Sequence, residues 1–71
     1  MESEEYLQAL GERIKALRLE RKLTQVELSE RVGIEDSALR RIESGRVNSS
    51  INMLRKIAKG LEVDVIELFK F

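Results

Sequence analysis

The chain has 71 residues, with 13 basic and 13 acidic side chains, and contains neither cysteine nor histidine. A chain this short should form one domain, residues 1–71, that hides only roughly 60% of its unfolded surface. The absence of thiol and imidazole groups rules out disulfides, thiolate metal sites and catalytic triads built on either group. We expect no cofactor and no metal. No acid pair, or nucleophile with its base, lies at the spacing that an enzyme needs.

The apolar runs of the chain are far too short to span a bilayer. Acidic residues at the start, Glu2, Glu4 and Glu5, stand where a secretion signal would be basic. We therefore expect a soluble cytoplasmic protein that makes no contact with a membrane.

The formal net charge is zero, which argues against nucleic-acid binding because Lys and Arg supply most of the non-specific affinity for phosphate. The charge is unevenly distributed, however. Residues 1–12 and 60–71 sum to −4 and −2, whereas residues 13–35 and 36–59 sum to +2 and +4. The pattern allows a cationic face built from the middle of the chain, with weak binding away from a target site.

A first amphipathic helix is predicted over about residues 4–21. Leu7, Leu10, Ile14 and Leu17 are spaced three, four and three apart, which gives one apolar stripe. Leu23 should end this segment and pack inward. The basic residues expected to face outward are Arg13, Arg21 and Lys22.

Residues 24–46 contain two short helical patterns that meet at Gly33. Thr24 and Glu27 have the spacing of a capping box, so the first of these helices should start at Gln25. Gly33 can adopt the positive φ that a sharp turn between crossed helices needs.

The second helix of this pair should run from about Asp36 to Ser44. Leu39 and Ile42 supply its apolar side, and Gly45 is its C-terminal stop. The region therefore predicts a helix, a tight turn and a second helix.

After this pair, residues 46–50 have the composition of a loop, and Ser50 should cap a further helix. Its outward side carries Arg55, Lys56 and Lys59. The positions expected to face inward are Ile51, Leu54, Ile57, Ala58 and Leu61.

Asp64, followed by Glu67, predicts a capped last helix from Val65 to about Phe69. Its apolar residues exceed what so short a helix can bury in its own domain, so some should meet another subunit. Alternatively, Leu68 and Phe69 simply close the core. The residues assigned to a subunit interface are Ile66, Phe69 and Phe71.

The central residues resemble the phage repressor and Cro (XRE-like) family of helix-turn-helix transcriptional regulators. The resemblance covers about residues 10–69 and implies an all-α, compact five-helix fold with the helix-turn-helix at about residues 25–44. In the motif it rests on Thr24, Gln25, Ser29, Gly33, Leu39, Ile42, Glu43, Gly45 and Arg46. Outside the motif it rests on Arg18, Asn48, Ser50, Leu54, Ile57, Ala58 and Leu61.

The resemblance implies that the second helix of the motif enters the major groove with its N-terminal residues at base edges. The residues expected to contact bases are Asp36, Ser37 and Arg41. Arg41 can donate two hydrogen bonds to guanine, worth roughly 1–3 kcal/mol of discrimination. Asp36 can accept from cytosine; the alternative is that it only complements the positive end of its helix.

Gln25 matches a family position that binds a phosphate, and the start of a helix favours anions. The other residues expected to contact phosphates are Arg40, Arg46 and Asn48, although both arginines can also be read as solvated surface. Relatives usually carry uncharged residues at the places of Glu35 and Arg40, so this surface is more highly charged than theirs.

In the family, the arginine at the place of Arg18 pairs with the glutamate at the place of Glu43 and ties the first helix to the recognition helix. The alternative is that both are ordinary surface charges. In a buried pair, removing one partner would strand a charge at a cost of roughly 3–5 kcal/mol.

These features predict a sequence-specific DNA-binding regulator of transcription. We expect double-stranded DNA and a second copy of the chain as partners, because small relatives commonly dimerise through their C-terminal helices. No small-molecule ligand is expected. The alternative is a protein-interaction module of the same fold, such as an antitoxin or a regulator subunit, which the zero net charge and the acids Glu35 and Asp36 favour.

Overall fold

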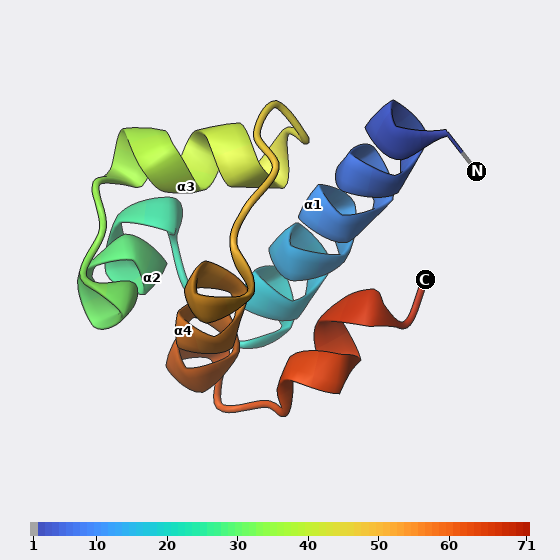
Figure 1. The fold of residues 1–71 in the computed structure, drawn as a ribbon. Helices are drawn as coiled ribbons and strands as arrows, with labels where there is room; N and C mark the ends of the chain where they lie inside the picture. The colour runs from blue at the N-terminus through green and yellow to red at the C-terminus, as the bar shows by residue number, and fades with distance from the viewer. Residues whose placement is uncertain (1) are drawn as a thin grey trace.

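The computed structural model of the chain describes residues 2–71 (Figure 1). Met1, the first residue of the predicted domain, lies outside the described residues. The elements follow in the order α1 (Ser3–Glu20), α2 (Gln25–Val32), α3 (Asp36–Glu43), α4 (Ile51–Leu61) and the 3-10 helix η1 (Val65–Phe69). Residues 2–71 contain no strand, which confirms the all-α fold, but the expected fifth α-helix is a 3-10 helix.

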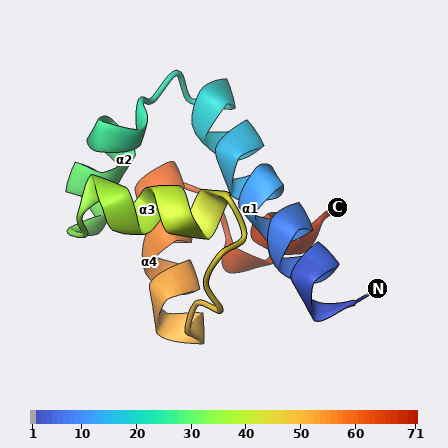
Figure 2. The same cartoon turned by 90° about the horizontal axis from the view of Figure 1, so that it is seen from above.

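The helices surround one core. In Figure 1, α3 runs across the top of the molecule, next to α2 and above α4, while α1 runs down the right side and η1 lies beneath it. Figure 2 shows that both ends of the described chain lie on the same side. No helix within residues 2–71 is both long and apolar enough to cross a membrane. The buried apolar side chains are Leu10, Ile14, Leu17, Leu23, Leu28, Leu39, Ile42, Leu54, Ile57, Ala58, Leu61 and Leu68.

Local signals start and stop the central helices as the sequence predicts. Thr24 Oγ1 accepts from the amide of Glu27 at 3.0 Å, and the amide of Thr24 donates to Glu27 Oε1 at 2.8 Å. This capping box starts α2 at Gln25. Gly33 ends α2 with a φ of 83°, a left-handed conformation that side chains with a Cβ adopt at a cost of about 1 kcal/mol or more. Ser50 Oγ accepts from the amide of Met53 at 3.0 Å and caps α4.

The predicted cap of the last helix is wrong. Asp64 forms no side-chain cap. A cap would need the amide of Glu67 as donor to the Asp64 side chain, but this amide donates to the backbone oxygen of Asp64 at 2.9 Å. The hydrogen bond spans three residues, which is the winding of a 3-10 helix and suits so short an element.

Two side-chain directions also differ from the prediction. Arg13 does not face outward, because its Nε donates to the backbone oxygen of Glu67 at 2.8 Å and joins α1 to η1. Ile51 does not face inward and is 66% exposed, because it begins α4 one turn before Leu54, the first core residue of that helix. For Arg13 the neighbouring element, rather than the pattern of the helix itself, decides the direction.

Candidate nucleic-acid interface

A buried ion pair fixes α1 against the end of α3. Arg18 Nε donates to Glu43 Oε2 at 2.8 Å, and Arg18 Nη2 donates to Glu43 Oε1 at 3.2 Å. Both side chains are buried, so this is the pair that the resemblance implies rather than two surface charges. Arg18 Nη1 also donates to the backbone oxygen of Leu23 at 2.8 Å. Within residues 2–71, no buried side-chain nitrogen or oxygen lacks a partner.

A close approach of backbones accompanies the ion pair. A Cβ built on Gly11 of α1 would lie 2.3 Å from the backbone oxygen of Glu43 and 2.6 Å from that of Ile42. Only glycine lets the two helices lie this close. Gly11 was not predicted from the sequence as a contact residue, although a glycine inside an otherwise helical pattern is a signal of such a contact.

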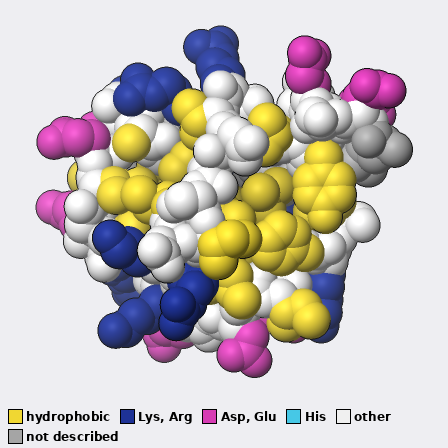
Figure 3. Space-filling view, in the orientation of Figure 1, with side chains coloured by type: hydrophobic (Ala, Val, Ile, Leu, Met, Phe, Trp, Pro, Cys, Tyr) yellow, Lys and Arg dark blue, Asp and Glu magenta, His cyan; other side chains and the backbone are white. Residues whose placement is uncertain are grey.

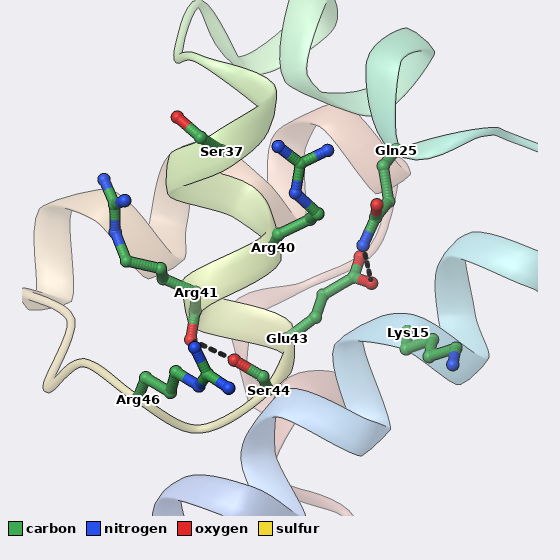
Figure 4. Close-up of a pocket in the computed structure, with 8 residues that line it drawn as sticks. All are labelled: Lys15, Gln25, Ser37, Arg40, Arg41, Glu43, Ser44 and Arg46. Carbon is green, nitrogen blue, oxygen red and sulfur yellow. Dashed lines mark hydrogen bonds between the residues drawn. The ribbon is translucent and has the colours of Figure 1, made fainter.

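A cleft of about 530 Å³ lies between α1, the start of α2 and the length of α3 (Figure 4). It contains four cationic side chains and one carboxylate, that of Glu43. The residues that line it are Lys15, Gln25, Ser37, Arg40, Arg41, Glu43, Ser44 and Arg46. The structure therefore brings together five residues that the sequence assigned to DNA contacts, namely Gln25, Ser37, Arg40, Arg41 and Arg46.

The carboxylate in this cleft is already satisfied. Glu43 accepts from Arg18, which lies behind the cleft, and from Gln25 Nε2 at 3.0 Å. Its negative charge therefore cancels that of Arg18. Of the four cations that line the cleft, Arg40 is paired with Asp36, and Lys15, Arg41 and Arg46 form no ion pair within residues 2–71. Gln25, expected to bind a phosphate, lies at the first position of α2 and is oriented by Glu43.

The residues expected to contact bases do not all share one face of α3. Figure 4 shows Ser37 and Arg41 projecting from the same side of the helix, as their spacing of one turn requires, whereas Arg40 points toward Gln25. Asp36 lies one turn before Arg40 and accepts from its Nη1 at 3.1 Å. Asp36 is therefore engaged with a cation rather than grouped with Ser37 and Arg41.

One predicted contact lies apart from the others. Asn48 lines a separate cleft of about 280 Å³ with Ser3, Tyr6 and Leu7, at the start of α1. Conversely, Lys15 and Ser44 line the main cleft and were not predicted. Ser44 follows α3 and donates through its hydroxyl to the backbone oxygen of Arg41 at 3.1 Å.

The C-terminal residues divide between the core and the surface. Leu68 is fully buried and Phe69 packs partly against the core, as the alternative interpretation held. Ile66 and Phe71 are 62% and 48% exposed, and the ring of Phe71 stands edge-on to that of Tyr6 with centroids 5.1 Å apart. Figure 3 shows apolar side chains gathered on this face of the molecule, over α1 and the C-terminal part of the chain.

Comparisons with known proteins identify the family of this helix-turn-helix fold. The helix-turn-helix family model HTH_3 matches residues 14–68. The chain is 46% identical over 56 residues to the immunity repressor protein of Bacillus phage phi105, covering 79% of this chain and 39% of that protein. It is 34% identical over 59 residues to an uncharacterized HTH-type transcriptional regulator of Archaeoglobus fulgidus, covering 83% of each. By name, both relatives are regulators rather than enzymes. The chain thus spans well under half of the phage repressor.

Solved structures show the same fold. The restriction-modification controller protein C.AhdI from Aeromonas hydrophila superimposes with a TM-score of 0.87 at 32% identity, over 89% of this chain and 96% of that one. The C.Esp1396I controller tetramer, in complex with its natural 35 base-pair operator, gives 0.84 at 32% identity, over 92% and 86% of the two chains. The resemblance drawn from the sequence is confirmed: the chain belongs to the helix-turn-helix family HTH_3, a family of transcriptional regulators and repressors.

Proposed function

We propose that this protein is a sequence-specific DNA-binding regulator of transcription that acts as a homodimer, with α3 in the major groove. The observation that carries the proposal is the cleft beside α3, which Gln25, Arg41 and Arg46 line and whose one carboxylate, that of Glu43, is neutralised by Arg18. An excess of positive charge beside an exposed helix is the footprint expected of a surface that meets phosphates.

Base recognition is assigned to one side of α3. Arg41 is exposed and forms no ion pair among residues 2–71, so its guanidinium is free to donate to a guanine edge. Ser37 lies one turn earlier on the same side and can donate or accept. Asp36 is the third residue of the proposed set, although it lies beside Arg40 rather than with Ser37 and Arg41, and Arg40 neutralises its carboxylate.

Phosphate contacts are assigned to Gln25, Arg40, Arg46 and Asn48. Gln25 stands at the start of α2, where free amides and the helix dipole favour an anion. Arg46 follows Gly45, whose φ of 76° turns the chain at the end of α3, and it lines the cleft. A role on DNA also supports the cytoplasmic location expected from the sequence.

The second copy is assigned to the apolar surface near the C-terminus. The residues proposed for that interface are Ile66, Phe69 and Phe71, and Tyr6 adjoins them through its contact with Phe71. A two-fold dimer would present two α3 helices to half-sites about 34–36 Å apart on one face of the duplex. The C.Esp1396I tetramer, which was solved on its operator, supports by similarity the assembly of more than one copy on DNA.

The DNA proposal is tested by binding to a labelled duplex of random sequence, followed by selection of preferred sites from a random pool. Affinity should fall steeply as salt rises, because bound counterions are released from the phosphates. Arg41→Ala should lose the preference for one base pair, at a cost of roughly 1–3 kcal/mol of binding free energy. Gln25→Ala should lower the affinity for all DNA sequences alike. Binding that is absent or insensitive to salt would overturn the proposal.

That outcome would instead favour a protein-interaction module. The observation behind this second candidate is the pair of Asp36 and Arg40, which neutralises charge on the face of α3, in a chain whose net charge is zero. Such a module should show no gain in affinity for any selected duplex.

The dimer is tested separately by sedimentation. Phe71→Ala and Ile66→Ala should shift the chain from dimer to monomer with the helical circular dichroism signal retained. Val26→Ala is the matched control, because Val26 is also exposed, at 52%, but lies on α2. An unchanged mass for both interface variants would remove this surface from the dimer.

A further inference from the structure

Lys15 is carried to the cleft by the close contact between α1 and α3. Gly11, Lys15 and Arg18 lie at positions i, i+4 and i+7 of α1, so they share one face of that helix. Gly11 touches the backbone of Glu43, and Arg18 binds its carboxylate. Lys15, between these two contacts, must therefore flank the end of α3.

The charge of Lys15 is not consumed inside the protein. Lys15 is exposed and is in no ion pair within residues 2–71, and the carboxylate nearest to it in the cleft is held by Arg18 and Gln25. Two other cations of the molecule differ in this respect, since Arg31 donates to Glu62 and Arg40 to Asp36. An unpaired lysine beside three arginines raises the positive potential of the cleft without any local compensation.

The position of Lys15 indicates which part of DNA it meets. In Figure 4, Lys15 and Gln25 lie on one side of α3, while Ser37 and Arg41 project from the other. Bases are assigned to the side of Ser37 and Arg41. The side of Gln25 is therefore left for the phosphate backbone of the DNA. A lysine ammonium can bind a phosphate there, because it is a compact charge with three rotatable donors.

We propose that Lys15 binds a phosphate of the DNA backbone from α1, on the same side of the cleft as Gln25. This inference rests on the proposed function and adds to it a contact from outside the helix-turn-helix. Gly11 and the Arg18–Glu43 pair are then positioning features for Lys15, because they set the distance between α1 and α3.

The test compares Lys15→Gln, Lys15→Arg and the parent chain on a random duplex across a salt series. Lys15→Gln should lower the slope of log affinity against log salt by about 0.9, the value for one phosphate. Between 50 and 200 mM salt, the parent should therefore lose about 3.5-fold more affinity than the variant. Lys15→Arg should restore the parent slope, and none of the three should differ in selected site.

Lys59→Gln is the matched control. It makes the same change of charge on α4, in a separate cleft formed with Arg31, Val32, Lys56, Gly60 and Glu62. It should leave the slope unchanged, and thermal unfolding should show both glutamine variants folded. Equal slopes for Lys15→Gln and Lys59→Gln, whether changed or unchanged, would overturn the contact while leaving DNA binding intact. A parent chain that fails to bind in a salt-dependent way would overturn the proposed function itself.

Discussion

Different kinds of interaction stabilise the two ends of this molecule. At the end that carries α2 and α3, buried polar groups are joined by short directional bonds from Arg18 and Gln25 to Glu43. At the end that carries η1, Leu68 anchors the chain in the core, and one partly buried arginine, Arg13, donates to a backbone oxygen. The first end exposes charge, and the second exposes apolar side chains.

This difference shows how a small chain can combine a rigid surface, at the α3 end, with one that tolerates repacking, at the η1 end. Burying charged groups demands defined geometry, because any unpaired one is costly. Apolar contacts are not directional and tolerate repacking. We therefore expect substitutions at the α3 end to cost more stability than matched substitutions at the η1 end.

The largest effect should follow from Glu43→Ala. This change leaves the guanidinium of Arg18 buried without its partner and should lower the free energy of unfolding by about 3–5 kcal/mol. Urea or thermal unfolding followed by circular dichroism measures it. The double variant Arg18→Met/Glu43→Leu is the control, because an apolar pair of similar size removes the stranded charge and should recover much of the loss. A single variant as stable as the parent would show that the pair is not buried in solution.

Gly11→Ala should rank next. The new Cβ would meet the backbone oxygen of Glu43, which cannot move aside as a side chain can, so the α1–α3 contact must open. We expect a loss of about 1–3 kcal/mol, even though alanine favours a helix over glycine by about 1 kcal/mol. Gly60→Ala is the matched control, because the atoms nearest to its Cβ would belong to side chains rather than backbone, those of Val32, Leu28 and Arg31 at 3.0, 3.2 and 3.6 Å. Equal stabilities for the two variants would contradict the close contact.

The α3 end was also the end that the sequence predicted best. The signals there are local: Thr24 reaches only to Glu27, and Gly33 needs only its own φ. Such features can be recognised without knowing what packs against them. The family resemblance assigned Gln25, Ser37, Arg40, Arg41 and Arg46 to DNA contacts, and the structure places all five along one cleft.

What the sequence did not predict depends on contacts between distant elements. Arg13 turns toward η1, 54 residues away along the chain, and Gly11 faces the end of α3. Lys15 joins the cleft only because of that contact, and its own helical pattern marks it merely as polar. Asp64 failed as a cap because a 3-10 helix uses the same amide differently. In each case the contact depends on a group outside the local pattern, and the pattern of a single helix does not show which group that is.

A smaller effect is expected from Arg13→Ala at the η1 end. The variant loses a hydrogen bond to the backbone oxygen of Glu67 that is only partly buried, so the cost should be about 1 kcal/mol. Amide hydrogen exchange should show faster opening of residues 65–69 with little change in α2 and α3. Arg21→Ala is the control, because Arg21 makes an exposed contact of 3.3 Å to Glu62. Equal acceleration throughout the chain would mean that η1 does not open by itself.

The smallest effects should appear on acidification. The backbone amide of Thr24 lowers the pKa of Glu27 below its ordinary value of 4.5, and a hydrogen bond from Lys70 lowers the pKa of Glu67 below the same value. A lowered pKa in the folded state means stability that is present above pH 4.5 and is lost as the pH falls through the lowered value. Glu27→Gln and Glu67→Gln should therefore each lose less stability on acidification than the parent chain.

High salt should distinguish the two carboxylates, when each is titrated by following its carboxyl carbon by NMR. The pKa of Glu67 depends mainly on a charged and exposed partner, Lys70, so salt should bring it back toward its ordinary value. The pKa of Glu27 depends mainly on a backbone amide fixed at the start of α2, and should stay low. If both pKa values returned equally, the capping box would be no more rigid than the surface pair, and the contrast between the two ends of the molecule would not extend to their exposed groups.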